Sequence, residues 1–269
     1  MQFLSVKKNK IDIKEFSSRH ATESDCELLI DKDTTILVDN IPAIVYIANI
    51  GSQIDSLFSV LENIKYDTST RTSGLVTTSK IFGYSPRNEI RQASCRAASI
   101  AYKQPYESEI LNKFAAVAGS KYFEVNNQLA LRHKQMTEER VVSAFRLKDS
   151  MFTSGIVNQN NPLKYHFDSG NYHGVWSAMF ALKKGITGGH LACPEFNLSL
   201  KCQHGSLTFF DGQSILHGVT PIIKNNKDAK RYTVVYYSLR KMWSCEEPKK
   251  EIERMRISRM KTETRRMTK

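Results

Sequence analysis

Residues 174–196 read GVWSAMFALKKGITGGHLACPEF, and this stretch decides the fold of the C-terminal half. It holds two apolar runs, GVWSAMFAL and GHLACPEF, on either side of the glycine-containing turn KKGITGG. Short apolar runs bounded by turn residues are typical of β-strands. Four further runs of this kind lie around it: FTSGIVN (152–158), SLTFFD (206–211), SILHGVTPII (214–223) and RYTVVYYSL (231–239). With almost no helical pattern between them, they predict an antiparallel sandwich or barrel of the jelly-roll or cupin kind.

The N-terminal half has a mixed pattern. TTILVDNIPAIVYIANI (34–50) predicts two short strands, and the apolar spacing of residues 54–64 predicts a helix after them. Residues 110–118 and 122–131 also have helical spacing, with a helix start at PYESEI (105–110). We therefore expect an α+β protein, in which N-terminal helices and strands pack on a double-stranded β-helix core.

Length and composition indicate a globular, intracellular protein. The chain has 269 residues, 41% of them hydrophobic, and no run approaches 18 consecutive apolar residues. The N-terminus lacks the apolar segment of a secretory signal, so we expect a protein that is not secreted. Its five cysteines are widely spread without a CxxC pair, which argues against a disulfide framework and a zinc ribbon. We expect reduced, mostly buried thiols.

Half of the net charge lies at the C-terminus. The chain carries +12, and residues 249–269 contain nine Lys or Arg against three Glu. A basic excess of this kind favours a polyanionic partner, because cations placed near phosphates release counterions. A solvated helix or a frayed tail explains the same charge. Charge alone therefore names no function.

A candidate metal site begins in YHFDSGN, residues 165–171. On an extended strand, residues i and i+2 face the same side, so His166 and Asp168 can point toward one ion. This pair alone is a weak signal. His217 lies in another β run of the same region, and two histidines with one carboxylate form the facial triad of non-haem Fe(II), which leaves coordination positions open. A structural zinc site needs four protein ligands, and no fourth is evident.

The strand RYTVVYYSL supplies a candidate anion site. Arg231, Thr233 and Val235 alternate with their neighbours and share one face. An arginine can grip a carboxylate bidentately, and the Thr233 hydroxyl can add a hydrogen bond to the same group. Such an arrangement is able to hold the far carboxylate of 2-oxoglutarate while the keto-acid end of that molecule chelates iron.

The order H-x-D, GGHL..P, FFDG....HGVTPI and R.T resembles the Tet/J-binding-protein branch of the Fe(II)/2-oxoglutarate dioxygenases. This branch oxidises the 5-methyl group of pyrimidines in DNA. The resemblance is best over residues 151–242 and extends more weakly upstream into FGYSPRNEIRQASCRAASIAY (82–102). Along the chain, it implies an N-terminal region (1–150) packed on the core, a dioxygenase core (151–242) and a basic tail (243–269).

The resemblance also implies a set of roles. Iron would be bound by His166, Asp168 and His217, and 2-oxoglutarate by Arg231 with Thr233, with O₂ as the other co-substrate. Asn171, three residues after the metal aspartate, would contact a pyrimidine that is flipped out of DNA or presented single-stranded, because a methyl group in the duplex cannot reach the iron. Further candidates for contacts to DNA are the histidines His173 and His190 for the base and, for the phosphates, Arg87, Arg91, Arg96 and the tail.

Three alternatives stay open at the level of sequence. A prolyl- or lysyl-type protein hydroxylase and an AlkB-like demethylase share the HxD…H…R order, whereas Asn171 and the basic tail favour a nucleic-acid base. A catalytically silent DNA-binding module is disfavoured because all three ligands and the arginine are present. The sequence does not distinguish thymine from 5-methylcytosine. It points to no membrane contact and to no obligate protein partner.

Overall fold

The computed structural model describes residues 1–70, 76–88, 90 and 93–267. Arg91, one of the phosphate-binding candidates, lies outside the described residues, as do the last two residues of the tail. The chain divides into two compact units. Unit 1 consists of Met1–Lys80 and Ile156–Tyr236, and unit 2 of Ile81–Gly155 and Tyr237–Lys269. Each unit therefore combines an N-terminal with a C-terminal segment, while the boundaries expected at 150 and 242 stay predictions.

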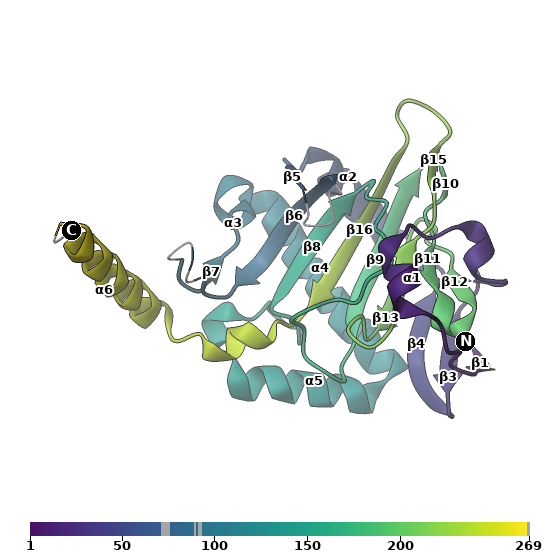
Figure 1. The fold of residues 1–269 in the computed structure, drawn as a ribbon, viewed down its shortest axis with the longest axis horizontal. Helices are drawn as coiled ribbons and strands as arrows, with labels where there is room; N and C mark the ends of the chain where they lie inside the picture. Colours follow the sequence, from purple (N-terminus) through teal and green to yellow (C-terminus); the bar gives the residue numbers. More distant parts are fainter. Residues whose placement is uncertain (71–75, 89, 91–92, 268–269) are drawn as a thin grey trace. The chain divides into compact units, whose positions relative to one another are not determined.

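Unit 1 is built from β-sheets (Figure 1). Its main sheet has the strand order β1-β3-β4-β13-β9-β16-β8-β6-β5, in which β6 and β8 belong to this unit only in part. A second sheet has the strand order β14-β11-β12-β2. β10 and β15 form an antiparallel pair. The N-terminal strands are β1 (Gln2–Val6), β2 (Leu28–Ile30), β3 (Thr34–Val38), β4 (Ile41–Ile47), β5 (Asp67–Thr70) and β6 (Val76–Ser85). The C-terminal strands are β8 (Ser154–Gln159), β9 (Ser177–Lys184), β10 (Ile186–Gly188), β11 (Leu191–Cys193), β12 (Leu198–Leu200), β13 (Ser206–Phe210), β14 (Gly218–Val219), β15 (Ile222–Lys224) and β16 (Lys230–Tyr237).

The core of unit 1 lies between the two sheets. It is one cluster of buried apolar side chains from β3, β4, β9 and β13 of the main sheet and from β2, β11 and β12 of the second sheet. Val235 of β16 packs against this cluster. Tyr232 is on the opposite face of the same strand and contacts Phe58 of α2 (Gln53–Asn63). The alternation expected along β16 is therefore present. Together the two sheets form a jelly-roll core, so the expected α+β fold class is confirmed.

The N-terminal segments contribute strands to both sheets of unit 1. β1 pairs parallel with β3, and β2 pairs parallel with β12 of the second sheet. The two strands expected in residues 34–50 are β3 and β4, and β4 pairs with β13 of the jelly roll. A short helix, α1 (Ile13–Ser18), lies between β1 and β2, and the side chain of Asp12 caps it. Much of the N-terminal region is thus part of the sheets themselves.

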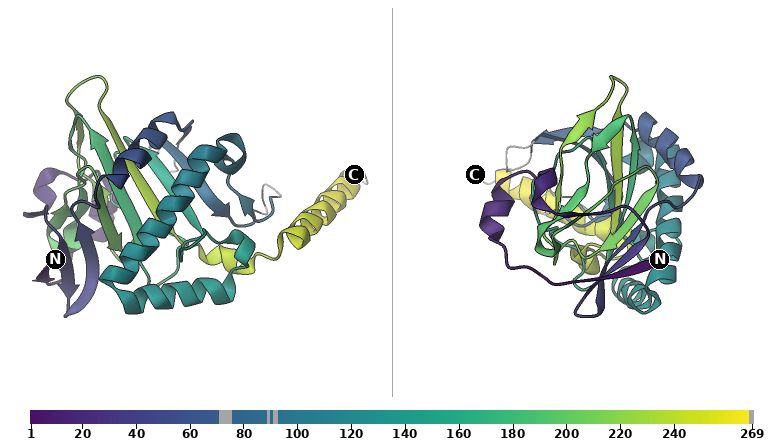
Figure 2. Two further views of the ribbon diagram at one scale, coloured as in Figure 1. Left: turned by 180° about the vertical axis from the view of Figure 1, so that it is seen from behind. Right: turned by 90° about the vertical axis from the view of Figure 1, so that its right-hand side faces the viewer.

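Unit 2 is mainly helical (Figure 2). The two expected helices are longer than predicted and meet at Asn126, whose side chain accepts a hydrogen bond from Leu129 N–H and so caps the second helix. β7 pairs with the end of β6. In Figure 2, α6 extends away from α4 and α5. Besides parts of β6 and β8 and the short 3-10 helices η2 (Ser143–Phe145) and η4 (Arg240–Ser244), this unit holds β7 (Arg96–Ala97), α3 (Ile100–Lys103), α4 (Pro105–Val125), α5 (Asn127–Arg140) and α6 (Pro248–Met267).

One expectation about the cysteines is wrong. Cys95 and Cys245 form a disulfide in unit 2, with their Cα atoms 5.9 Å apart, although 150 residues separate them in the sequence. These two cysteines are therefore far apart in the sequence but adjacent in the fold, so sequence spacing is a poor guide to disulfide pairing. Cys26, Cys193 and Cys202 are free and buried, as expected.

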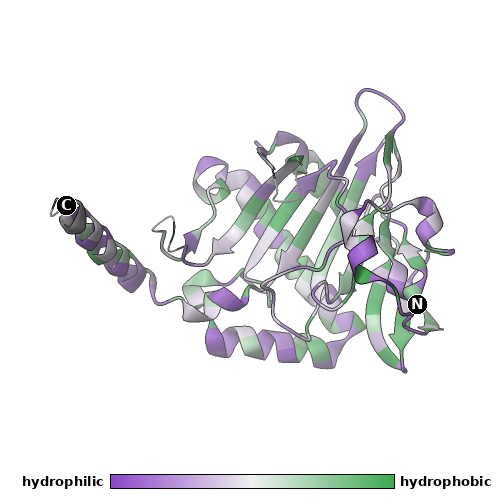
Figure 3. Cartoon of the chain, in the orientation of Figure 1, coloured by the Kyte–Doolittle hydropathy of each residue, from purple (hydrophilic) through white to green (hydrophobic). Residues whose placement is uncertain are grey.

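Hydropathy follows the two architectures. Hydrophobic residues gather on the strands of the β-core, whereas α5 and α6 are mostly hydrophilic (Figure 3). None of the described helices is both long and apolar enough to span a membrane.

Candidate active site

A backbone pairing brings the two histidines of the site together. His166 N–H donates to the His217 carbonyl at 2.9 Å, and His217 N–H donates to the His166 carbonyl at 3.1 Å. This isolated antiparallel bridge places the ring centroids 4.4 Å apart. Two residues after His166, the Asp168 N–H donates to the Gly212 carbonyl at 2.8 Å, and this bond fixes the backbone position of Asp168. The three side chains offer ligand atoms that all lie within 4.8 Å of one another.

Hydrogen bonds to the backbone set the tautomer of both rings. Nδ1 of His166 lies 2.8 Å from the Lys164 carbonyl, and Nδ1 of His217 lies 2.9 Å from the Ile215 carbonyl. A carbonyl oxygen only accepts, so each Nδ1 carries a proton, and in the neutral form of each ring the free lone pair is on Nε2. Both Nε2 atoms face the same Asp168 oxygen, at 3.9 Å from His166 and 4.0 Å from His217.

These three residues fit a divalent metal ion. Ligand atoms bonded to one ion at about 2.1 Å lie at most about 4.2 Å apart. Both Nε2–Oδ1 distances fall within this limit but exceed the about 3.0 Å between neighbouring ligand atoms of a facial site, so the side chains must draw closer to hold one ion together. Two neutral imidazoles and one carboxylate are the donor set of a facial Fe(II) site, which leaves positions for other ligands. Since about 30% of the Asp168 side chain is exposed, the site is accessible from solvent.

Gly212 makes room for the carboxylate of Asp168. A Cβ added at Gly212 would lie 2.2 Å from Oδ2 of Asp168, closer than real atoms approach. The backbone there must therefore stay bare for Asp168 to keep its position. The sequence signal was a glycine five residues before His217, in FFDG, but spacing alone gave it no role.

Arg231 is buried in an electropositive environment. Its side chain is fully buried, and its Nε donates to the Gly189 carbonyl at 3.0 Å. Gly189 adopts a positive φ of 67°, and a Cβ there would meet the Arg231 Nε at 2.7 Å. Among the described residues, no carboxylate forms an ion pair with Arg231. A buried guanidinium of this kind favours an anionic ligand.

Lys183 and His190 share the environment of Arg231. Lys183 is directly opposite Arg231 in the β9–β16 register, so both side chains leave the sheet on one face. Burial lowers the pKa of Lys183, and the charge of Arg231 lowers it further. Burial likewise lowers the pKa of His190; Glu23 opposes this, while Lys183 and Arg231 reinforce it. His190 Nδ1 is buried without a hydrogen-bond partner. Neither residue was assigned to the anion site from sequence.

Comparison with known proteins identifies the family. The family model described as the oxygenase domain of the 2OGFeDO superfamily, Tet_JBP, matches residues 80–240, more than half of the chain. The chain belongs to the Tet/JBP family. The matched range contains all six residues assigned from sequence to the Tet/JBP site: His166, Asp168, Asn171, His217, Arg231 and Thr233.

The relatives of this Tet/JBP chain are distant and much longer. "Bifunctional helicase and thymine dioxygenase JBP2" of Leishmania tarentolae is 25% identical over 138 residues, which are 50% of this chain and 12% of that protein. The protein of the same name from Leishmania major is 26% identical over 146 residues, 53% of this chain and 13% of that protein. The chain thus spans about an eighth of these relatives. A solved structure, NgTET1 in complex with 5mC DNA, matches with a TM-score of 0.59 at 14% identity, over 87% of this chain and 88% of that chain.

Asn171 and Thr233 have partners inside the protein. The Asn171 amide nitrogen lies 3.5 Å from Asp168 Oδ2 and 3.4 Å from Ser177 Oγ, so the amide points toward the metal carboxylate. The Asn158 amide donates to Thr233 Oγ1 at 3.4 Å, which leaves the Thr233 hydroxyl proton for another acceptor. The contacts of these two residues with base and co-substrate stay predictions.

Proposed function

We propose that this chain is an Fe(II)- and 2-oxoglutarate-dependent dioxygenase that hydroxylates the 5-methyl group of a pyrimidine base in DNA. The observation that carries the proposal is that Nε2 of His166, Nε2 of His217 and the carboxylate of Asp168 lie within 4.8 Å of one another, with both Nδ1 atoms hydrogen-bonded to the backbone. Membership of the Tet/JBP family supports the reaction class. The thymine dioxygenase relatives and the fold match to a protein bound to 5mC DNA support the substrate.

The metal and its co-substrates supply the oxidising power. When bound, Fe(II) with O₂ and 2-oxoglutarate would supply the oxidising power to hydroxylate an unactivated C–H bond, with one oxygen atom going to the methyl group and the other to succinate as CO₂ is released. His166, Asp168 and His217 hold the ion. Arg231, with Lys183 and His190 beside it, binds the far carboxylate of 2-oxoglutarate and so orients its keto-acid end toward the metal.

Asn171 links the metal site to the base. Its amide nitrogen is directed at Asp168, which leaves the amide oxygen to accept from a base N–H or amine group. The base must leave the stack to arrive there, because the target methyl group is otherwise held in the duplex. Asn171 is therefore a positioning residue, whose loss should alter the choice between bases as well as the rate.

The test uses two DNA duplexes, one containing 5-methylcytosine and one containing only thymine as its methylated base. Each is incubated with the protein, Fe(II), 2-oxoglutarate and O₂, and the nucleosides are analysed by mass spectrometry. We expect a hydroxymethyl base from at least one duplex and one succinate per product. Absence of product from both duplexes, together with hydroxylation of a peptide or removal of a methyl group, would refute the proposal.

A further inference from the structure

α6 starts from a buried anchor in unit 2. Glu251 is the only buried residue among 248–264, and it is 1% exposed. Its carboxylate accepts hydrogen bonds from Arg87 and from the backbone N–H of Cys95 and Glu246. Burial acts to raise the pKa of Glu251, but these bonds outweigh it and lower the pKa. The Cys95–Cys245 disulfide joins the same two segments, so the first turn of α6 is held firmly.

The remainder of α6 is exposed and basic. Apart from the anchor, no residue of 248–264 is buried. Of its cations, only Arg254 forms an ion pair within the described residues, with Glu246 at 2.7 Å. Exposed pairs of this kind are weak, so Arg254 can exchange its partner for a phosphate. The exposed cations of 248–264 are Lys249, Lys250, Arg254, Arg256, Arg259 and Lys261.

Three of these cations form a line, here called the cationic stripe: Lys250, Arg254 and Lys261. At about 100° per residue they fall within about 40° of the helix circumference, with no acidic residue among them. At about 1.5 Å per residue the stripe is about 16 Å long. The other three cations lie on a different side of the helix, where Glu253 and Glu263 are interspersed with them.

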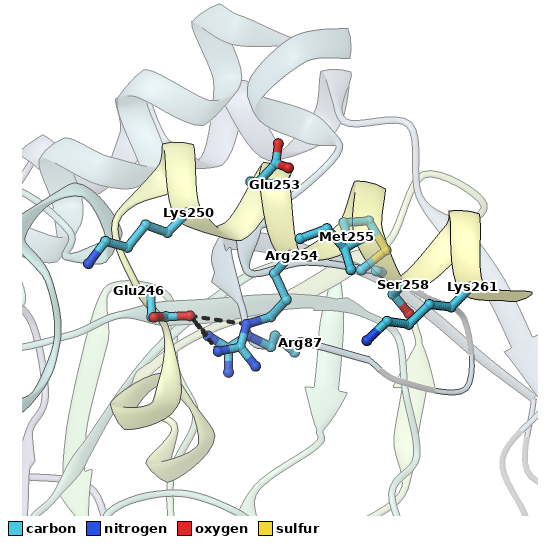
Figure 4. A pocket seen from close by; sticks show the side chains of 10 residues that line it. Arg87, Glu246, Lys250, Glu253, Arg254, Met255, Ser258 and Lys261 are labelled. Carbon is cyan, nitrogen blue, oxygen red and sulfur yellow. Dashed lines mark hydrogen bonds and ion pairs between the residues drawn. The ribbon is translucent and has the colours of Figure 1, made fainter.

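The cationic stripe borders a groove. The groove has a volume of about 710 Å³, and its charged lining consists of the whole stripe together with Arg87 and the two carboxylates of Glu246 and Glu253. Figure 4 shows Lys250 and Lys261 on either side of Arg254, whose guanidinium lies beside that of Arg87 at the Glu246 carboxylate. Two arginines thus share one exposed carboxylate, and the two lysines form no ion pair with any described residue.

We propose that the cationic stripe binds the phosphodiester backbone of duplex DNA. This inference rests on the proposed function, which makes DNA the substrate. One DNA strand carries a phosphate about every 3.4 Å along the axis, so 16 Å of helix faces about five phosphates. An anionic membrane fits less well, because the exposed apolar residues Ile252, Ile257 and Met260 are dispersed among charged ones and form no continuous apolar face.

The test compares two triple variants of the full chain that remove equal charge. The stripe variant carries Lys250→Gln, Arg254→Gln and Lys261→Gln; the control carries Lys249→Gln, Arg256→Gln and Arg259→Gln. Affinity for a labelled duplex is measured by fluorescence anisotropy between 50 and 200 mM salt. We expect the stripe variant to bind at least about tenfold more weakly at 50 mM salt, with a salt slope shallower by about 2.7, from about 0.9 per lost phosphate contact.

The control variant should bind within about twofold of the wild type, and both variants should retain its helix content by circular dichroism. If both variants bound DNA equally weakly, the effect would depend on total charge and not on the stripe, and the proposal would be overturned. So would unchanged binding by the stripe variant, or a stripe-dependent affinity for phosphatidylserine vesicles that exceeds the affinity for DNA.

Catalysis and stripe binding can fail separately. The same titrations in an Asp168→Ala background measure DNA binding without turnover. Stripe-dependent binding by a wild type that forms no hydroxymethyl base would refute the proposed function and support the stripe. Hydroxymethyl formation with stripe-independent binding would support the function and refute the stripe.

Discussion

The two units hold histidines in opposite tautomers. In unit 1, Nδ1–H of His166 and of His217 each donates to the carbonyl two residues earlier, and both Nε2 atoms face Asp168. In unit 2, His133 Nε2 lies 2.8 Å from Ser238 Oγ. That hydroxyl already donates its only proton to the Met151 carbonyl, so His133 Nε2 must carry the proton itself.

The difference separates a ligand from a core residue. His133 is 1% exposed, and burial lowers its pKa to about 3, so it stays neutral and donates within the core. Its ring contacts the aromatic rings of Tyr122 and Phe152. A histidine that binds a metal through Nε2 instead needs that lone pair aimed at a shared centre. Burial alone therefore does not mark a metal ligand; the partner of the other ring nitrogen does.

The largest effect expected is the loss of the carboxylate at that shared centre. Asp168→Ala should reduce hydroxymethyl product below detection, because two imidazoles alone hold the ion weakly and leave its charge unbalanced. Nucleoside mass spectrometry measures the product. The His133→Gln variant is the control, since it changes a histidine outside the site and should keep activity. Product formation by Asp168→Ala would show that the ligand assignment is wrong.

Replacing Arg231 by lysine tests the anion pocket. Lysine keeps the charge but loses the planar fork, and a charge-assisted hydrogen bond of this kind contributes about 1.5–3 kcal/mol. We expect Arg231→Lys to weaken 2-oxoglutarate binding about 10- to 100-fold in calorimetric titrations with Mn(II) present. Lys183→Met should weaken it less. Unchanged affinity in Arg231→Lys would place the co-substrate elsewhere.

Gly212→Ala probes the room left for the metal carboxylate. The new methyl group would lie 2.2 Å from Asp168 Oδ2, so the carboxylate must move off the shared centre. Metal affinity should fall about 10- to 100-fold, as it does when residues that orient metal ligands are lost. Gly119→Ala is the matched control: its Cβ would lie 3.4 Å from its nearest neighbour, within a helix. Equal metal affinity in both variants would contradict the steric argument.

The smallest effect concerns the stability of unit 2. The pKa of folded His133, about 3, lies below the ordinary value of about 6.5, so the unfolded chain takes up this proton first as the pH falls. The free energy of unfolding should therefore decrease between about pH 6.5 and 3, by about 2 kcal/mol at pH 5. Urea unfolding at pH 7 and pH 5 measures this decrease in the free energy of unfolding. In His133→Gln the contribution of the histidine to the decrease should disappear. An identical pH dependence in both proteins would contradict it.

The sequence predicts those features that short-range patterns determine. Alternation and turn residues located the six C-terminal β segments, of which only SILHGVTPII forms two short strands, β14 and β15, rather than one. The sequence predicted His166, Asp168 and His217 as one set, whereas the backbone bridge that joins His217 to His166 is seen only in the structure. Periodicity along β16 anticipated that Arg231 points inward.

Features that depend on register or on distant packing were not predictable. β1 and β2 are short, and only their parallel partners, β3 and β12, make them strands. Lys183 joins Arg231 through cross-strand pairing, which no local pattern reveals. The importance of Gly212 is a steric property of two chain segments in contact. Cys95 and Cys245 likewise meet only in the folded chain.

The most direct test is an anaerobic calorimetric titration of the protein with Fe(II), comparing the wild type with His217→Ala and His133→Gln. Our interpretation predicts one ion per chain in the wild type and in His133→Gln, and no saturable binding in His217→Ala. Retention of the ion by His217→Ala, or its loss in His133→Gln, would contradict the assignment of His166, Asp168 and His217 as the metal centre.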